Sequence, residues 1–507
     1  MVMNGATESL GPGLSPFLAS VRSGQDEDFR TPFWERAPRS EILGKWDQVF
    51  DPQMAKLPGR LGEIELEQRD KVGPLSIRLP LRQRLPQISE YFSRFKTNVP
   101  EIELSESVVL GLYAQSRLRP LSLSNAAGEL AGNTNSGYPL FTRRGRVRGD
   151  DIAYAQNGAW RKFPAILGWR GQSSGLEEDP KQRTVWMYPQ STNIREMQLF
   201  RPLQNLMSNG SHHAAWRTIE DVDSAVENVF RASEETGEPV FSIDFSSFDQ
   251  SVGPLLSSMA FDIARALFQK GNEQLFDDVE EVFHTIGMLI QPSQVLTGMH
   301  GVPSGSVFTN WIDSVVQLEV AAHCARTLDS SYEPWNQVQG DDGLLVLPGV
   351  SDVSGIADCM LEFGLEMSSD KQFIGDEDCV YLQRYYHKSQ KGGMYPTYRA
   401  LNSLMGQERF FDEDEWGPDM VILRSIMILE NAKNSPLFTD LVTFVMNGDK
   451  YRLGAAWPGG IDSLLFESNV VSKAKSIAGF IPSYNQEDRL GGLRNFQTYK
   501  FIKENEQ

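Results

Sequence analysis

The sequence predicts an α+β fold in which an antiparallel sheet carries helices against one face. One observation is the stretch 240–249, which begins as a buried strand and ends in a polar turn. A second is the stretch 338–347, where glycines flank two adjacent aspartates and an apolar run follows. Such turns are typical of β-hairpins, so the aspartates are expected at a hairpin tip. The third is the set of amphipathic helical patterns between and after these strands.

The composition is that of a folded protein. Its 40% hydrophobic residues and 10 Trp are typical of a folded protein. The 507 residues exceed what one core usually holds, so several subdomains are expected. No apolar run approaches the roughly 18 residues of a transmembrane helix, and the N-terminal residues do not resemble a secretory signal. The widely spaced Cys324, Cys359 and Cys379 are expected to be buried thiols of a reducing compartment, with neither a disulfide framework nor a zinc site.

The net charge of −19 counts against a protein that coats nucleic acid. The segment 143–201 nevertheless carries eleven basic and six acidic residues. This local excess indicates a funnel for phosphates. The alternative is an ordinary solvated face.

The elements before the first buried strand are irregular. Residues 1 to about 30 lack periodicity and are expected to form a loose arm. A turn at 136–139 precedes the basic loop 143–146. The β-branched and aromatic residues of 181–189 predict a strand with cations at its start.

The later elements are more regular. Pro254 opens one predicted helix and a second covers roughly 273–290. A Gly/Ser loop at 298–306 runs into another helix. Further elements are a helix that Gly364 ends, short strands at 365–367 and 379–386, and a mostly helical region after about 396.

Three carboxylates could meet at the ends of the predicted strands: Asp244, Asp341 and Asp342. Adjacent carboxylates repel, and Mg²⁺ or Mn²⁺ would supply the counter-charge. Neighbouring strands lie about 4.8 Å apart, so such carboxylates could share two cations about 3.5–4 Å apart, which suits phosphoryl transfer. A solvated Asp-Asp-Gly turn is the alternative.

The sequence resembles the RNA-dependent RNA polymerases of RNA viruses, especially the picobirnavirus and partitivirus group. Asp244-x4-Asp249 matches motif A, and Gly340-Asp341-Asp342 matches motif C. Pro303-Ser304-Gly305 with Thr309 matches motif B.

Weaker matches complete the order of seven motifs between about 136 and 384. The segment 367–371, which contains Lys371, resembles motif D, and Tyr381–Arg384 resembles motif E. Lys181 and Arg183 resemble motif F, and Ser136-Gly137-Tyr138-Pro139 resembles motif G. Seven partial matches in the right order are far more specific than a Gly-Asp-Asp sequence alone.

The resemblance implies roles for these residues. Asp244 and Asp341 would bind the metal directly, with Asp342 in support. Asp249, helped by Ser304, would accept the ribose 2′-OH. Lys371 would protonate the leaving pyrophosphate, although an ordinary surface lysine is the alternative.

The other implied site residues bind nucleotide or RNA. Arg183 would stack on the incoming base and touch its triphosphate. The remaining nucleotide contacts would be Lys181, Gly305, Thr309 and Asp313. RNA contacts would be Ser136, Gly137, Tyr138 and Arg384, the last of which could instead pair with an acid. Asp313 stands where many of these polymerases have Asn, so either Asp249 or Asp313 could read the 2′-OH.

The resemblance also implies a right-hand polymerase with fingers, palm and thumb. The implied parts are an N-terminal extension at 1–70, fingers at 71–238, palm at 239–255 with motif A, a fingers insertion at 256–296, palm at 297–395, and a thumb and tail at 396–507. The enzyme would replicate and transcribe a viral RNA genome by two-metal-ion nucleotidyl transfer.

Its partners would be the RNA template, nascent RNA and ribonucleoside triphosphates. Capsid protein is a candidate partner, a membrane is not expected, and the expected location is the virion interior and host cytoplasm. Two rival functions stay open. A reverse transcriptase shares the paired aspartates, and a non-catalytic RNA-binding protein could retain the fold.

Overall fold

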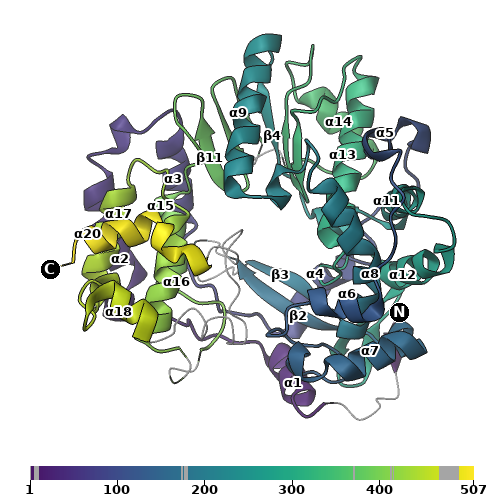
Figure 1. Cartoon of the computed structure of the whole chain (residues 1–507), viewed down its shortest axis with the longest axis horizontal. Coiled ribbons are helices and arrows are strands. Elements are labelled where there is room, and N and C mark those ends of the chain that lie inside the picture. Colours follow the sequence, from purple (N-terminus) through teal and green to yellow (C-terminus); the bar gives the residue numbers. More distant parts are fainter. Residues whose placement is uncertain are drawn as a thin grey trace. The chain divides into compact units, whose positions relative to one another are not determined.

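The computed structural model describes residues 2–4, 11–172, 175, 181–368, 372–411, 414, 416–467 and 490–506 (Figure 1). The chain forms two compact units. The first unit comprises Met1–Gly24, Pro80–Trp169 and Thr184–Leu382. The second unit comprises Gln25–Leu79, Arg170–Arg183 and Gln383–Gln507. Each unit is therefore assembled from segments that are distant in sequence.

A four-stranded antiparallel sheet lies at the centre of the first unit. Its strands, in spatial order, are β7 (Gln337–Gln339), β8 (Asp342–Leu345), β4 (Val240–Ile243) and β9 (Phe373–Gly375). All four residues of β4 are buried, as predicted for a buried strand. β7 and β8 form the predicted hairpin, and Gly340 at its turn has a φ of 62°, which glycine adopts without strain.

Helices lie beside this sheet in Figure 1. They are α9 (Ile219–Thr236), α11 (Pro254–Leu267), α13 (Thr309–Thr327) and α14 (Ser354–Glu362). α9 contacts β4, and α13 contacts both β7 and α14. α9 begins with a capping box between Thr218 and Asp221. Pro254 opens α11 as predicted, and Gly364, with a φ of 83°, follows α14.

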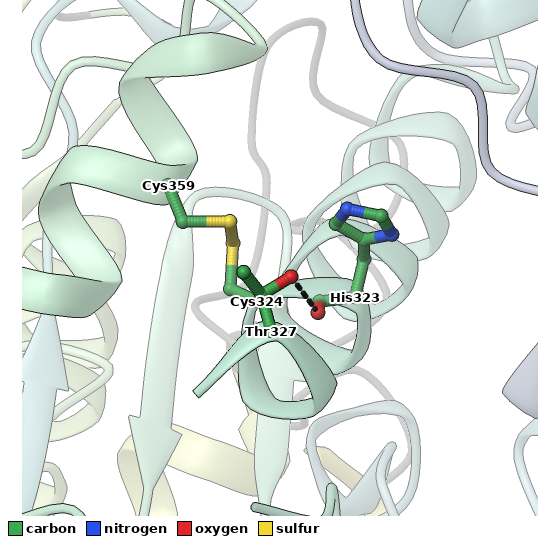
Figure 2. Close-up of a disulfide and its surroundings, with 4 residues drawn as sticks. All are labelled: His323, Cys324, Thr327 and Cys359. Atoms are coloured by element: carbon green, nitrogen blue, oxygen red, sulfur yellow. Dashed lines mark hydrogen bonds between the residues drawn. A yellow bond between two sulfur atoms is a disulfide. The ribbon is translucent and has the colours of Figure 1, made fainter. Parts of the chain in front are cut away.

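A disulfide joins two of these helices (Figure 2). Cys324 on α13 bonds to Cys359 on α14, and their Cα atoms lie 5.7 Å apart, which is normal for a disulfide. The expectation of unpaired thiols is therefore wrong for these two residues, although Cys379 is a free buried cysteine. The partners are 35 residues apart, and only the packing of α13 on α14 brings them together. The cysteines thus give no support to a reducing compartment.

A second sheet has the strand order β1 (Val2–Asn4), β6 (Gln294–Leu296), β5 (Met288–Gln291), β2 (Ala165–Gln172) and β3 (Lys181–Met187). β3 is the strand predicted at 181–189. The helix predicted for 273–290 ends at Thr285, because the chain turns into the hairpin of β5 and β6. Helices of the same unit are α1 (Leu14–Ser23), α4 (Leu81–Glu90), α5 (Val108–Tyr113), α6 (Leu123–Glu129), α7 (Arg148–Asn157), α8 (Gln190–Met207), α10 (Phe248–Ser251) and α12 (Glu273–Thr285).

The expected loose N-terminal arm is wrong for α1. Leu14, Leu18 and Val21 are buried at helical spacing, and they anchor this segment in the first unit. The Gly, Ser and Pro residues around this short helix obscure its pattern in the sequence. Of the two short strand regions expected near the end of the first unit, β10 (Asp378–Tyr381) and β11 (Arg384–His387) confirm the second. Met367 in the other forms only an isolated bridge with Phe245.

The second unit is mostly helical, as predicted after residue 396. Its helices are α2 (Arg39–Phe50), α3 (Leu61–Asp70), α15 (Thr397–Met405), α16 (Pro418–Glu430), α17 (Phe438–Gly448), α18 (Gly460–Glu467) and α20 (Gln497–Glu504). Residues from both ends of the chain form its core. The rings of Phe50 and Tyr398, for example, lie 5.3 Å apart. No helix among the described residues has both the length and the apolar character needed to cross a membrane.

Candidate active site

Strand register brings the three predicted metal-binding aspartates to one end of the central sheet. Ile243 on β4 pairs with Gly343 on β8. Asp244 directly follows Ile243, and Asp342 directly precedes Gly343 at the start of β8. Asp341 occupies the turn between β7 and β8. The three aspartates therefore lie at the same end of two adjacent strands, β4 and β8.

The backbone at Asp244 is held in place where β4 ends. Its carbonyl accepts hydrogen bonds from Ser368 N at 3.0 Å and from Gln372 Nε2 at 2.7 Å. Just after it, the Ser246 and Ser368 hydroxyls lie 2.9 Å apart. These contacts fix the turn that leads from β4 into α10, where Asp249 lies.

A polar stripe on α13 supports the hairpin turn. Gly340 N donates to Ser314 Oγ at 2.8 Å. The side-chain amide of Gln317 satisfies its neighbours when its nitrogen faces Gly340 O and its oxygen faces Gly343 N. In this orientation it donates to Gly340 O at 2.8 Å and accepts from Gly343 N at 3.3 Å. Gln317 and Ser314 are both buried. They therefore set the backbone position of the turn that carries Asp341.

The same face of α13 brings Asp313 toward the aspartates. Asp313 is only 4% exposed, and its Oδ1 atom has no hydrogen-bond partner among the described residues. Burial raises the pKa of Asp313 well above its usual value, and the charges of Asp249 and Asp341 raise it further. Asp249, Asp313 and Asp341, which the sequence separates widely, thus share one electrostatic environment.

The loop with the motif B residues packs against both α10 and β3. Val302 N donates to Asp249 O at 2.6 Å, and Trp186 N donates to Ser304 Oγ at 3.2 Å. The Thr309 hydroxyl closes the loop by donating to Pro303 O at 3.0 Å. The Ser304 and Thr309 side chains therefore bind protein backbone in this structure.

The motif G turn is held by internal contacts. Ser136 is buried, and its hydroxyl accepts from Thr142 N at 3.2 Å. Tyr138 is also buried, with its ring 5.4 Å from that of Phe163. Gly137 has a φ of 70°, and a Cβ there would lie 2.3 Å from Tyr188 O. The contacts of these three residues therefore hold the turn in its shape.

Three of the remaining predicted residues belong to the second unit. They are Lys181 and the exposed Arg183, at the start of β3, and Arg384 of β11, whereas the rest of β3 from Thr184 belongs to the first unit. The Arg384 guanidinium donates to Asn431 O at 2.8 Å and to Gly393 O at 3.3 Å. Lys371 lies outside the described residues.

The residues that support the hairpin turn were not predicted from the sequence. Asn310, Asp313, Ser314 and Gln317 recur at the spacing of one helical face of α13. That polar stripe is a signal that could have identified Ser314 and Gln317. The predicted basic funnel is also partly neutralised by the protein, since Arg161 pairs with Asp278 and Arg201 with Glu129.

The aspartates fit a divalent cation by their chemistry. No group of three or more His, Cys, Asp or Glu side chains is arranged to hold a metal within the part of the chain that the structure describes. Mg²⁺ in polymerase sites, however, is bound by one or two carboxylates together with water and substrate phosphates. Asp244 and Asp341 carry carboxylate oxygens of this hard type.

Comparisons with known proteins agree with this geometry. A model of the viral RNA-dependent RNA polymerase family matches residues 134–400. The chain is 34% identical to a potential RNA-dependent RNA polymerase of a human picobirnavirus, over 97% of this chain and 96% of that protein. It is 26% identical to the RNA-directed RNA polymerase of Cryptosporidium parvum virus 1, over 51% of this chain and 53% of that protein.

Solved structures give the same result. The crystal structure of the RNA-dependent RNA polymerase of a human picobirnavirus matches with a TM-score of 0.87 and 30% identity, covering 98% of this chain and 97% of that one. An insertion-loop deletion mutant of such a polymerase matches with a TM-score of 0.86 and 29% identity, with the same coverage. The α+β fold is thus that of a right-hand polymerase. The predicted resemblance is confirmed, and the chain belongs to the viral RNA-dependent RNA polymerases.

Proposed function

We propose that this polymerase replicates and transcribes a viral RNA genome by nucleotidyl transfer with two divalent cations. The observation that carries the proposal is the register of β4 and β8, which places Asp244 beside the turn with Asp341 and Asp342. In this proposal the segments 239–255 and 297–395 form the palm, 71–238 and 256–296 the fingers, and 396–507 the thumb and tail.

Asp244 and Asp341 would hold Mg²⁺ or Mn²⁺, with Asp342 in support. When bound, such cations activate the attacking hydroxyl and stabilise the charge on the transferred and leaving phosphates. Asp249 or Asp313 would orient the ribose through its 2′-OH. The shared environment of these two residues with Asp341 supports placing the nucleotide there.

Other residues would bind charge and RNA. Lys181 and Arg183 would contact the triphosphate, and Lys371 would protonate the pyrophosphate leaving group. Ser304, Gly305 and Thr309 would shape the nucleotide site. The RNA contacts would come from the turn Ser136–Pro139 and from Arg384.

The test is incorporation of labelled ribonucleotide on a single-stranded RNA template with Mg²⁺ or Mn²⁺. Asp341→Ala is expected to lower synthesis by about 1,000-fold, since it removes a charge that holds the cation. The matched control is Asp358→Ala, which removes an exposed aspartate from α14. This control is expected to keep the activity of the unchanged protein.

Three outcomes would contradict the proposal. Synthesis that survives Asp341→Ala removes this residue from the metal site. Preferential incorporation of deoxyribonucleotides on the same template favours the reverse transcriptase. Binding of RNA without synthesis, by a folded protein, favours the non-catalytic RNA-binding protein.

Location and the capsid contact are separate proposals. We propose that the chain acts in the virion interior and host cytoplasm, and that capsid protein is its partner. Isolation of virus particles followed by immunoblotting tests both, because a packaged polymerase sediments with the particles. A polymerase found only in the unassembled fraction contradicts packaging.

A further inference from the structure

We infer that Glu196 on α8 is a positioning residue that holds Gly305–Val307 of the motif B loop in the shape needed to bind the nucleotide. The inference rests on the proposed function, in which this loop shapes the nucleotide site. None of the seven motifs includes Glu196, which lies 110 residues before Ser306 in the sequence.

Both carboxylate oxygens of Glu196 are bound to this loop. Ser306 Oγ donates to Oε1 at 2.8 Å, and Val307 N donates to Oε2 at 3.0 Å. Ser306 Oγ in turn accepts from Phe308 N at 3.0 Å, at the residue that precedes α13. One carboxylate therefore fixes the place where the loop becomes the helix that carries Asp313.

Asn193, one turn earlier on α8, extends this contact. Its Nδ2 atom donates to Gly305 O at 3.0 Å and to Glu196 Oε2 at 3.3 Å. Its Oδ1 atom accepts from Arg144 Nη2 at 2.8 Å. The Asn193 amide is therefore oriented by partners on both sides, and it links the basic loop 143–146 to the motif B loop.

β3 holds the loop from another side. Trp186 N donates to Ser304 Oγ, and a Cβ at Gly305 would lie 1.6 Å from Trp186 O. The loop thus has a strand against 304–305 and the α8 carboxylate against 306–307. Loss of the α8 contact leaves one side unsupported, and small displacements of substrate-positioning groups are costly for catalysis.

The burial of Glu196 argues against an incidental contact. The side chain is 1% exposed, and burying a carboxylate is unfavourable unless hydrogen bonds compensate it. Burial raises its pKa to about 7, while the bonds from Ser306, Val307 and Asn193 oppose this rise. The groups that compensate the buried carboxylate are thus those of the loop and of α8.

Glu319 on α13 provides a matched control. It is also fully buried, and it also accepts from one serine hydroxyl and from backbone amides. Its donors are Ser107 Oγ at 2.6 Å, Val108 N at 3.0 Å and Val109 N at 3.0 Å. These residues belong to the start of α5, which carries no predicted site residue. The same chemistry therefore occurs both at the motif B loop and away from it.

The experiment compares Glu196→Gln, Glu196→Leu and Glu319→Leu in the full chain. It measures KM and kcat for ribonucleotide incorporation, thermal unfolding, and hydrogen exchange of the peptide that covers 303–309. Glu196→Leu is expected to raise KM about tenfold, with a smaller change in kcat, because it leaves a buried amide and hydroxyl without their acceptor. It should also speed exchange in this peptide.

The other variants separate positioning from general stability. Glu196→Gln keeps one acceptor oxygen and is expected to raise KM only a few-fold. Glu319→Leu should lower the unfolding temperature and leave both KM and the exchange of 303–309 unchanged. If Glu196→Leu does not fold, Glu196→Gln decides the question by the same two measurements.

Unchanged KM and exchange in the Glu196 variants would overturn the inference, as would an equal rise of KM in Glu319→Leu. The exchange measurement does not require RNA synthesis. If the protein without substitutions makes no RNA, the proposed function is refuted. Hydrogen exchange of the peptide that covers 303–309 would still report whether Glu196 holds the loop.

Discussion

Gly305 lies where the motif B loop touches β3. The close approach of Trp186 O leaves no space for a Cβ, and the obstructing atom is backbone, which cannot rotate away. The glycine is therefore needed for a close approach of two chain segments. This explains in steric terms why the sequence Pro-Ser-Gly forms the loop.

Gly305→Ala is expected to lower RNA synthesis at least tenfold and stability by about 1–3 kcal/mol, because the added methyl group forces the loop off β3. Gly128→Ala is the control. Gly128 is exposed in α6 and has open space where a methyl group would be added, so alanine should be neutral or stabilise the helix by about 0.5–1 kcal/mol. Initial rates and thermal unfolding measure both. Equal activity of the two variants would contradict the steric argument.

The residues proposed for the site differ in how clearly the sequence indicates them. Asp244 and Asp341 were predicted because each stands in a short pattern with its own neighbours. Glu196 was not, because an acidic residue within a helix is usually solvated, and only the fold brings it to Ser306. Gln317 was missed because only the fold brings it to the turn between β7 and β8, although the polar stripe on α13 carries a usable signal.

At the scale of elements, a buried carboxylate joins α3 to α15. Glu65 accepts from Thr397 N at 2.8 Å and from Tyr398 N at 3.2 Å, at the start of α15. This is capping by a residue from a distant segment, since the two helices lie more than 300 residues apart. Burial raises the Glu65 pKa from 4.5 to about 7, and the bonds from Thr397 and Tyr398 oppose this rise.

The raised pKa predicts a pH-dependent stability. Below pH 4.5 Glu65 is protonated in both states, and its contribution is fully present. As the pH rises to about 7, the unfolded chain loses this proton more readily than the folded chain, so stability falls. Glu65→Gln should remove a fall of about 2 kcal/mol, measured by urea unfolding at pH 5 and pH 7.5.

Glu63→Gln is the control for this measurement, because Glu63 is exposed on the same helix. It should retain the fall in stability of the unchanged chain. If Glu65→Gln shows the same fall as Glu63→Gln, the Glu65 carboxyl does not titrate as its burial implies.

Elements were predicted well where periodicity was strong and poorly where it was weak. α11, α14 and the β7–β8 hairpin each combine an apolar pattern with a clear boundary residue, and the structure contains all three. The hairpin of β5 and β6 was absorbed into a predicted helix, because short apolar strands have no distinctive period. α1 was missed because its apolar residues cover only one short stripe.

At the scale of the whole molecule, the second unit depends on both ends of the chain. Trp46 and Phe50 of α2 are fully buried, against Phe444 of α17 and Tyr398 of α15 respectively. The sequence could not show this arrangement, because no local pattern connects segments that are hundreds of residues apart. It did predict the mostly helical character of the C-terminal region.

A chain that ends at Leu382 should therefore expose the apolar face of α2, since its partners in α15 and α17 are absent. We expect stronger binding of a hydrophobic dye and aggregation at concentrations where the full chain does not aggregate. Dye fluorescence and size-exclusion chromatography measure the two effects. A monomeric fragment with the dye binding of the full chain would show that Gln25–Leu79 folds without the C-terminal segments.

The bond between Cys324 and Cys359 closes a covalent ring, and the hairpin that carries Asp341 and Asp342 is part of this ring. A protease that cuts once inside this ring opens the loop but does not separate the two pieces. The nicked protein should run as one band without a reductant and as two bands with it. A single peptide-bond break beside the turn of this hairpin thus stays hidden until the sulfur bridge is reduced.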